Sequence, residues 1–329
     1  MVAGAAAAAV GADRQVSMSI MTSRFLRSVA VAAGLMLPAI AAAQPPRGVQ
    51  TPEEAVSALR TAARAKDIQP LLALLGAGGR DLASSSDAAT ARQHRAVFLV
   101  AMREGWKLAD VSADRKELVV GREEWPFPVP LVKTAKGWVF DAAAGKEEVI
   151  TRRIGRNELA AIQIVKTYVA AQRAYAKRGH DAIPAGAYAR RLASTAGTED
   201  GLYWPVKSGE PHSPLGPLVA EAAAEGRALG VSAQSIPFHG YYFRILEKQG
   251  PDAQGGARSY VVGGAMTGGF ALVAWPAAYG NTGVMTFIVG PDGTTYEHDL
   301  GANTASAVKA ITAFNPDNTW HNVVAAEQP

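Results

Sequence analysis

The segment that most limits the fold of this chain is residues 240–301, where short apolar runs alternate with glycine-rich turns. Runs of β-branched and aromatic residues between glycines are typical of strands joined by tight turns. Residues 286–289 and 294–299 are two such runs, and Pro291, Asp292 and Gly293 between them favour a hairpin turn. We therefore expect an antiparallel meander in the last third of the chain.

A long amphipathic helix is predicted before this meander, at residues 157–179. Its apolar positions recur at helical spacing and are Leu159, Ile162, Val165, Val169 and Tyr175. We expect Asn157 to be the N-cap and Gly179 to end the helix. Residues 151–329 then predict a C-terminal α+β domain, in which the helix packs on the meander.

Residues 44–150 predict a separate N-terminal α+β domain, with helices first and a small antiparallel sheet after them. Thr51 and Glu54 flank Pro52 in a capping-box pattern, which favours a helix start. Two further helices are expected from Asp67 and from residues 84–87. The predicted strands are residues 106–111, 117–121, 131–134 and 137–140.

The first 43 residues have the layout of a cleavable signal peptide. Arg24 and Arg27 precede an apolar stretch, and small residues at 41–43 follow it. The apolar stretch is shorter than the ~20 residues that a membrane-spanning helix needs. We therefore expect cleavage after Ala43 and a periplasmic protein without stable membrane insertion. Translation is expected to start at Met18 or Met21.

The composition excludes several classes of function. The chain has no cysteine, so it has no disulfide, thiolate nucleophile or lipid-bearing cysteine. Its net charge is only +4 and no block of lysines and arginines occurs, which argues against nucleic-acid binding. We expect no cofactor, and an envelope protein or a glycan as partner.

No catalytic motif is present. The chain lacks a Gly-x-Ser-x-Gly elbow, a His-Glu-x-x-His helix and a phosphate-binding glycine loop. Its six histidines are not spaced as a metal pair on one helix face. The adjacent acids Glu123 and Glu124, and likewise 147–148 and 199–200, leave a cell-wall hydrolase as an alternative, because glycosidases use two carboxylates.

Two groups of residues are candidates for binding. The first is Arg152, Arg153 and Arg156, three cations close together in the sequence, which could attract an anion or pair with nearby glutamates. The second is an aromatic group that could form a shelf for a glycan or peptide, or be buried in the core. Its members are Tyr203, Trp204, Trp275 and Tyr279.

Five segments together make a resemblance to a known family specific. They are RRIGRNE at 152–158, AQRAYA at 171–176, DGLYWP at 200–205, GYYFRIL at 240–246 and GGFALVAWPAAYG at 268–280. With them the chain resembles the bacterial family called domain of unknown function 2950, over nearly all of its mature length. The resemblance implies an exported protein of Gram-negative bacteria and implies no activity.

The C-terminal half is also similar, in the order of its elements, to the soluble heads of type IV pilin-like proteins. The similarity consists of a long helix followed by GYYFRI, ALVAWP and TFIV segments. Pilin-like subunits begin with an apolar helix, whereas here the helix follows a whole domain, which argues against a filament subunit. The sequence favours a non-enzymatic envelope component, with a hydrolase or an accessory of pilin-like assemblies as alternatives.

Overall fold

A computed structural model describes residues 48–65, 67–76, 78–79, 82, 88–207, 209–224 and 237–323. Its helices and antiparallel sheets form an α+β fold, as predicted. The predicted signal peptide lies outside the described residues. No helix in the described part of the chain is long and apolar enough to cross a membrane.

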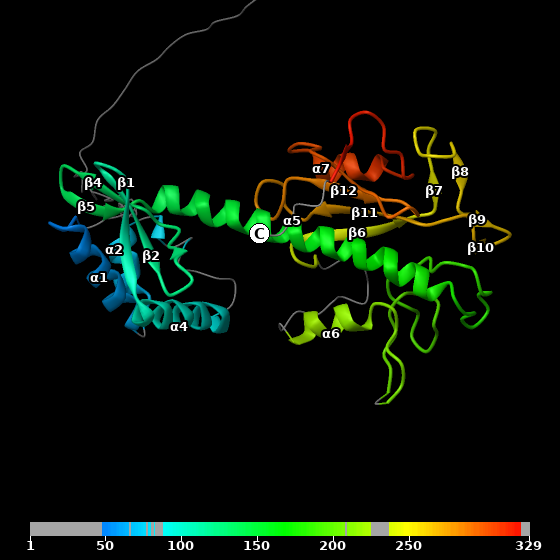
Figure 1. The fold of residues 1–329 in the computed structure, drawn as a ribbon, viewed down its shortest axis with the longest axis horizontal. Helices are drawn as coiled ribbons and strands as arrows, with labels where there is room; N and C mark the ends of the chain where they lie inside the picture. Colours follow the sequence, from blue (N-terminus) through cyan, green and yellow to red (C-terminus); the bar gives the residue numbers. More distant parts are fainter. Residues whose placement is uncertain are drawn as a thin grey trace, which may run out of the picture. The chain divides into compact units, whose positions relative to one another are not determined.

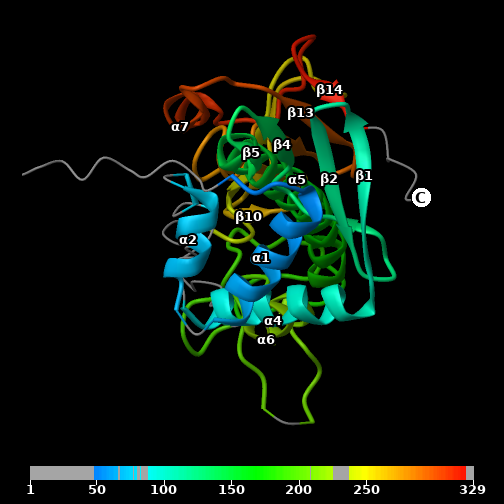
Figure 2. The same cartoon turned by 90° about the vertical axis from the view of Figure 1, so that its left-hand side faces the viewer.

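The N-terminal module, residues 48–141, packs helices against a small antiparallel sheet (Figure 2). Its helices are α1 (Pro52–Arg64), α2 (Gln69–Leu75) and α4 (Ala88–Glu104). Its strands are β1 (Trp106–Ser112), β2 (Arg115–Val120), β3 (Trp125–Pro126), β4 (Leu131–Thr134) and β5 (Gly137–Phe140). The predicted capping box of α1 is confirmed, because Thr51 accepts from the Glu54 amide while the Glu54 side chain accepts from the Thr51 amide. The start predicted for α4, at residues 84–87, falls outside the described residues.

One continuous helix, α5 (Ala142–Tyr175), follows the N-terminal module and is 34 residues long (Figure 1). The prediction that Asn157 caps this helix was wrong: Asp141 is the N-cap and accepts from the Ala144 amide. The predicted domain boundary between residues 150 and 151 therefore lies inside a helix. Gly145 lets α5 approach the hydrophobic core of the N-terminal module closely, since a Cβ there would lie 2.7 Å from a methyl of Val129.

The C-terminal module, residues 176–323, is built on a sheet with the order β14-β13-β12-β11-β6. The predicted meander is confirmed, because all of these neighbours pair antiparallel. The sheet strands are β6 (Tyr241–Leu246), β11 (Ala271–Pro276), β12 (Thr286–Val289), β13 (Thr295–His298) and β14 (His321–Asn322). Short elements complete the module: α6 (Gly216–Ala224), β7 (Lys248–Gln249), β8 (Arg258–Ser259), β9 (Val261–Val262), β10 (Ala265–Met266), α7 (Thr304–Ala307) and the 3₁₀ helix η1 (Val308–Ala310).

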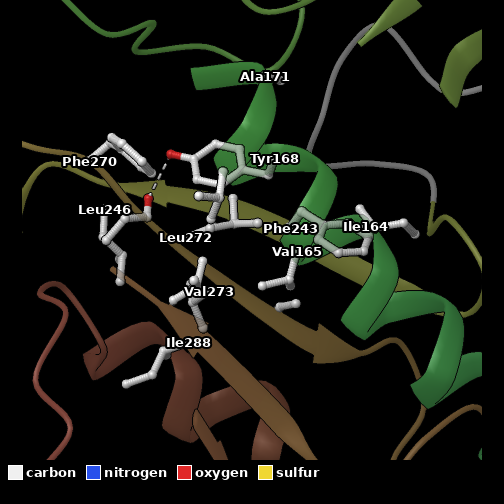
Figure 3. Packing of buried hydrophobic residues seen from close by; sticks show 14 of the residues in the cluster. Ile164, Val165, Tyr168, Ala171, Phe243, Leu246, Phe270, Leu272, Val273 and Ile288 are labelled. Carbon is white, nitrogen blue, oxygen red and sulfur yellow. Dashed lines mark hydrogen bonds between the residues drawn. The ribbon is translucent and has the colours of Figure 1, made fainter. Parts of the chain in front are cut away.

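The second half of α5 supplies one side of the C-terminal core. Ile164, Val165 and Tyr168 face apolar side chains of β6 and β11 (Figure 3). The Tyr168 hydroxyl donates to the Ala271 carbonyl at 3.0 Å, so a buried polar group is satisfied. Burial raises the pKa of Tyr168 far above its ordinary value, which keeps this hydroxyl a donor. The Tyr168 bond therefore ties β11 to α5. β6 is the last strand in the order and lies at the edge of the sheet.

Candidate binding pocket at the edge of the C-terminal sheet

A pocket of about 490 Å³ lies at the end of β6. Its lining includes five consecutive residues, 244–248. Successive side chains on an extended chain point to opposite faces of a sheet, so a pocket over one face would be lined only by alternate residues. The pocket therefore lies along the edge of β6. Arg190, Ser259, Val261 and Thr312 complete its wall.

Two tight turns place this edge. Before β6, His239 and Gly240 both have positive φ, 46° and 73°, which is the geometry of a type I′ turn. Gly240 is required there for a second reason, because a Cβ would lie 2.5 Å from the Asn157 amide nitrogen. After β6, the chain turns back through β7 and β8, and the Tyr260 amide donates to the Glu247 carbonyl at 2.8 Å.

Arg190 and Glu247 form a two-bond ion pair at one side of the pocket. Arg190 Nε donates to Glu247 Oε1 at 2.7 Å, and a terminal nitrogen of the same guanidinium donates to Oε2 at 3.0 Å. The hydrogen bond to Glu247 raises the pKa of Arg190. Both side chains are nearly half exposed, 48% and 42%, so the pair is worth little in stability. Its effect is to neutralise the one carboxylate of the pocket.

Arg244 is held without a counter-charge. One of its terminal nitrogens donates to the carbonyls of Val308 and Ile311, each at 2.7 Å, and the guanidinium lies 5.6 Å from the centroid of the Trp275 ring. Burial lowers the pKa of Arg244. Within the described residues no carboxylate pairs with it. The neutral carbonyls orient the cation and leave its charge in place.

Lys248 is the third cation of the pocket. It is exposed, and its ammonium has no carboxylate partner among the residues that the structure describes. The pocket wall thus carries three cations and a single carboxylate, which Arg190 already holds. Such a surplus of positive charge in a concave site attracts anions.

The predicted arginine cluster is divided among different partners. Arg152 donates to Glu148 and to the Pro126 carbonyl, at 2.7 and 2.6 Å, and lies over the Trp125 ring. Arg153 donates to Asn281 at 2.7 Å. Arg156 is exposed, and no described residue pairs with it. Pairing with nearby groups, the alternative that the sequence left open, therefore describes Arg152.

The four aromatic residues predicted as a shelf lie in different contact groups. Trp204 is buried against Tyr175 and His180, and Tyr203 is partly buried beside the same core. Trp275 packs on Tyr242, at 5.7 Å between ring centroids. The Tyr279 hydroxyl lies 3.1 Å from Asp299, and this hydrogen bond raises the pKa of Tyr279. No ring contact among the described residues joins Trp204 to Trp275.

His180 is the nearest thing to a catalytic histidine, and its geometry is structural. It is buried, with Nδ1 2.8 Å from Glu199 Oε2 and Nε2 2.9 Å from the Tyr175 carbonyl. Both ring nitrogens are therefore engaged by oxygen atoms of the chain itself. The ring also stacks on Tyr175, at 3.9 Å between centroids.

Each of the acid pairs that suggested a hydrolase has at least one member with a partner within the chain. Burial alone would raise the pKa of Asp200, but hydrogen bonds from Thr195 and Thr198 outweigh it and lower that pKa. Glu124 pairs with Lys107. In the described part of the chain, no three histidine or acidic side chains come together as a metal site.

The pocket residues were not identified from the sequence. Arg190 is more than 50 residues from Arg244 and Lys248 in the sequence, and each of the three is an ordinary surface cation when viewed alone. One signal was present: Arg244 is the single charge within the apolar strand GYYFRIL. A charge in such a strand indicates an edge or a site.

Comparison with known proteins gives a family and nothing closer. Residues 47–323 match the model of the family described as "Protein of unknown function (DUF2950)". Searches of the curated proteins and of the solved structures found no match to the chain.

Proposed function

Because the chain belongs to the DUF2950 family, whose description names no activity, we propose a function from its own sequence and surface. It is an exported protein that binds a carboxylate-bearing component of the cell envelope, a protein or a glycan, and catalyses no reaction on it. The observation that carries this proposal is the edge pocket, where Lys248 and Arg244 have no counter-charge within the described residues.

Export is supported by the first 43 residues. They contain the basic pair, the apolar stretch and the small residues of a signal peptide. Secretion of the chain from a Gram-negative host, followed by mass spectrometry of the periplasmic protein, tests this. We expect an N-terminus at Gln44. A periplasmic protein that keeps residues 29–37 would contradict cleavage.

Binding is favoured over hydrolysis by the residues of the pocket wall. Among the described residues no histidine lines it, and the one acid that does, Glu247, is held by two bonds to Arg190. The Ser259 hydroxyl donates to the Val261 carbonyl, so it has no adjacent base. A glycosidase needs two carboxylates, and this wall offers one.

The binding test compares charged and neutral forms of two ligand classes by isothermal titration calorimetry. The probes are a short peptide with one aspartate and an oligogalacturonate, each beside its uncharged counterpart, the asparagine peptide and the methyl ester. We expect the charged form of one class to bind better, and Lys248→Gln to weaken that binding about tenfold, as for loss of one charged hydrogen bond.

Lys166→Gln is the matched control, because Lys166 is an exposed lysine on α5 that does not line the pocket. It should bind the probes as the unaltered protein does. If Lys166→Gln and Lys248→Gln weaken binding equally, the pocket is not the site. If no charged probe binds, the proposed function fails.

A further inference from the structure

One edge of β6 has backbone groups without a hydrogen-bond partner among the described residues. Ala277 donates to the Gly240 carbonyl at 2.9 Å, and the register of β6 on β11 continues from this pair. Hydrogen-bonded pairs alternate along an antiparallel ladder, so the even-numbered residues of β6 bond to β11. The odd-numbered residues then direct their amide and carbonyl groups away from the sheet.

One of these three outward residues, Tyr241, has partners, as does Glu247 just after β6, whereas Phe243 and Ile245 have none among the described residues. Tyr241 exchanges two hydrogen bonds with Phe238, at 2.8 and 3.0 Å, and the Glu247 carbonyl accepts from Tyr260. Phe243 and Ile245 lie between them, and no described residue bonds to their outward groups. Within the part of the chain that the structure describes, β6 thus presents a short open window, closed at each end by bonds from its own chain.

The open window and the pocket overlap at Ile245. Ile245 belongs to the window and also lines the pocket, whose wall continues through residues 246–248 with side chains from each face of the strand. Val261 follows Tyr260, whose amide bonds to the Glu247 carbonyl, and is the first residue of β9. The pocket wall thus has apolar side chains at Ile245 and Val261 and a cation at Lys248. An extended segment placed along this edge would meet backbone groups first and a cation at its end.

From this overlap we propose that the window of β6 at Phe243 and Ile245 docks an extended peptide, whose backbone adds to the sheet and whose carboxylate pairs with Lys248. Strand addition to a sheet edge is a known mode of peptide recognition, in which the main chain gives affinity and pockets give specificity. Two outward residues offer four backbone hydrogen bonds. The proposal rests on the proposed function and selects its ligand class.

The chemistry favours a peptide over a glycan. The outward groups of Phe243 and Ile245 recur two residues apart, about 6.6 Å along a strand. An extended peptide carries donors and acceptors at that repeat, with alternate side chains directed to the two faces. The charge of the wall, three cations against one carboxylate, selects an acidic segment.

The test uses fluorescence anisotropy with a labelled hexapeptide, Thr-Val-Thr-Val-Thr-Asp, whose C-terminus is amidated so that the aspartate side chain is its one carboxylate. Two altered peptides accompany it, one N-methylated at alternate residues and one ending in asparagine. N-methylation removes the backbone donors and leaves the charge, so it should weaken binding about tenfold or more if strand addition is correct. The asparagine peptide and Lys248→Gln should weaken binding similarly, and Lys166→Gln should not.

Amide hydrogen exchange supplies the second readout, and it needs no protein variant. In the free full-length protein the Ile245 and Phe243 amides should exchange faster than that of Arg244, which bonds to β11. Binding of the hexapeptide should slow them. Slow exchange in the free protein at every concentration would show that the chain already covers its edge, and slow exchange only at high concentration would show a second copy there; either overturns the proposal.

The two proposals fail in different ways. If the N-methylated peptide binds as well as the parent while Lys248→Gln weakens both, the carboxylate pocket stands and strand addition is wrong. The same holds if oligogalacturonate binds at the pocket and the hexapeptide does not. If neither probe binds, both proposals are wrong.

Discussion

Polar side chains in the middle of α5 and in the edge pocket differ in what they have left to bind. On α5, Arg152 and Glu158 each contact groups of their own chain, including a carboxylate for Arg152. In the pocket, Lys248 has no carboxylate partner among the described residues, and the described partners of Arg244 are neutral, two carbonyls and the Trp275 ring. Cations that are close together in the sequence can therefore have separate partners, whereas the cations of the pocket lie on one wall and exceed its carboxylates.

The largest of the effects considered is expected at Glu158 of α5, whose carboxylate bonds to a distant part of the chain. One of its carboxylate oxygens accepts from the amides of Val284 and Met285, at 2.8 and 3.0 Å. Glu158→Ala leaves two backbone donors without their acceptor, so the free energy of unfolding in urea should fall by about 2–3 kcal/mol.

Glu147→Ala is the control for this change, because Glu147 is exposed on the same helix. Its effect should stay within about 0.5 kcal/mol, as for most surface substitutions. Equal losses in the two variants would mean that Glu158 is not a structural acceptor. The contrast between the internally bonded side chains of α5 and those of the pocket would then not hold.

A smaller loss is expected at Arg152. Arg152→Ala removes the ion pair with Glu148, the bond to the Pro126 carbonyl and the contact with Trp125. We expect a loss of about 1–2 kcal/mol, mainly from the bond of a charged group to a carbonyl. Arg156→Ala, without a described partner, should change the thermal midpoint little; a larger loss there than at Arg152 would reverse the assignment.

Asn157 and Asp141 test where α5 begins. Asp141→Ala removes the N-cap and should cost about 1 kcal/mol of stability. Asn157→Ala should also destabilise, by about 1 kcal/mol, through loss of its bond to the Thr282 carbonyl at 2.8 Å. The double variant Asn157→Ala with Thr282→Gly keeps the carbonyl of residue 282, so we expect the losses of stability of the two single variants to add. NMR chemical shifts that show the helix beginning at Asn157 would contradict a start at Ala142.

The smallest change in stability is expected at Lys248. Lys248→Gln breaks no ion pair known from the described residues, so its thermal midpoint should equal that of the unaltered protein. Differential scanning calorimetry checks this. A marked drop in the midpoint would show that Lys248 stabilises the fold, and the pocket would then resemble α5.

The sequence predicted those elements whose signals are local. The capping box at Thr51 and the hairpin around Asp292 depend on residues a few positions apart, and both are confirmed. The predicted start of α5 was wrong because the polar run RRIGRN is typical of a junction between domains. In the structure Arg152 and Asn157 of this run bond to distant carbonyls. Those bonds are set by tertiary packing, which no local pattern contains.

The pocket was beyond prediction for the same reason. Arg190, Arg244 and Thr312 are brought together only by the path of the chain around one sheet edge. The residues predicted as binding groups instead show what proximity in sequence can mean: Arg152 and Arg153 are adjacent, yet their partners, Pro126 and Asn281, are far apart in the chain.

The length of α5 also affects how the protein unfolds. Its first turn carries Ala142 in one hydrophobic cluster, and its last turns carry Tyr168 and Tyr175 in the other. Helical hydrogen bonding is cooperative, and a helix without packing is marginal in water. Melting of either cluster removes support from turns that the other needs. The two clusters are thus thermodynamically linked through a shared helix, and a polypeptide ended at residue 150 would keep Ala142 but lose Arg152, which bonds to the Pro126 carbonyl and lies over Trp125.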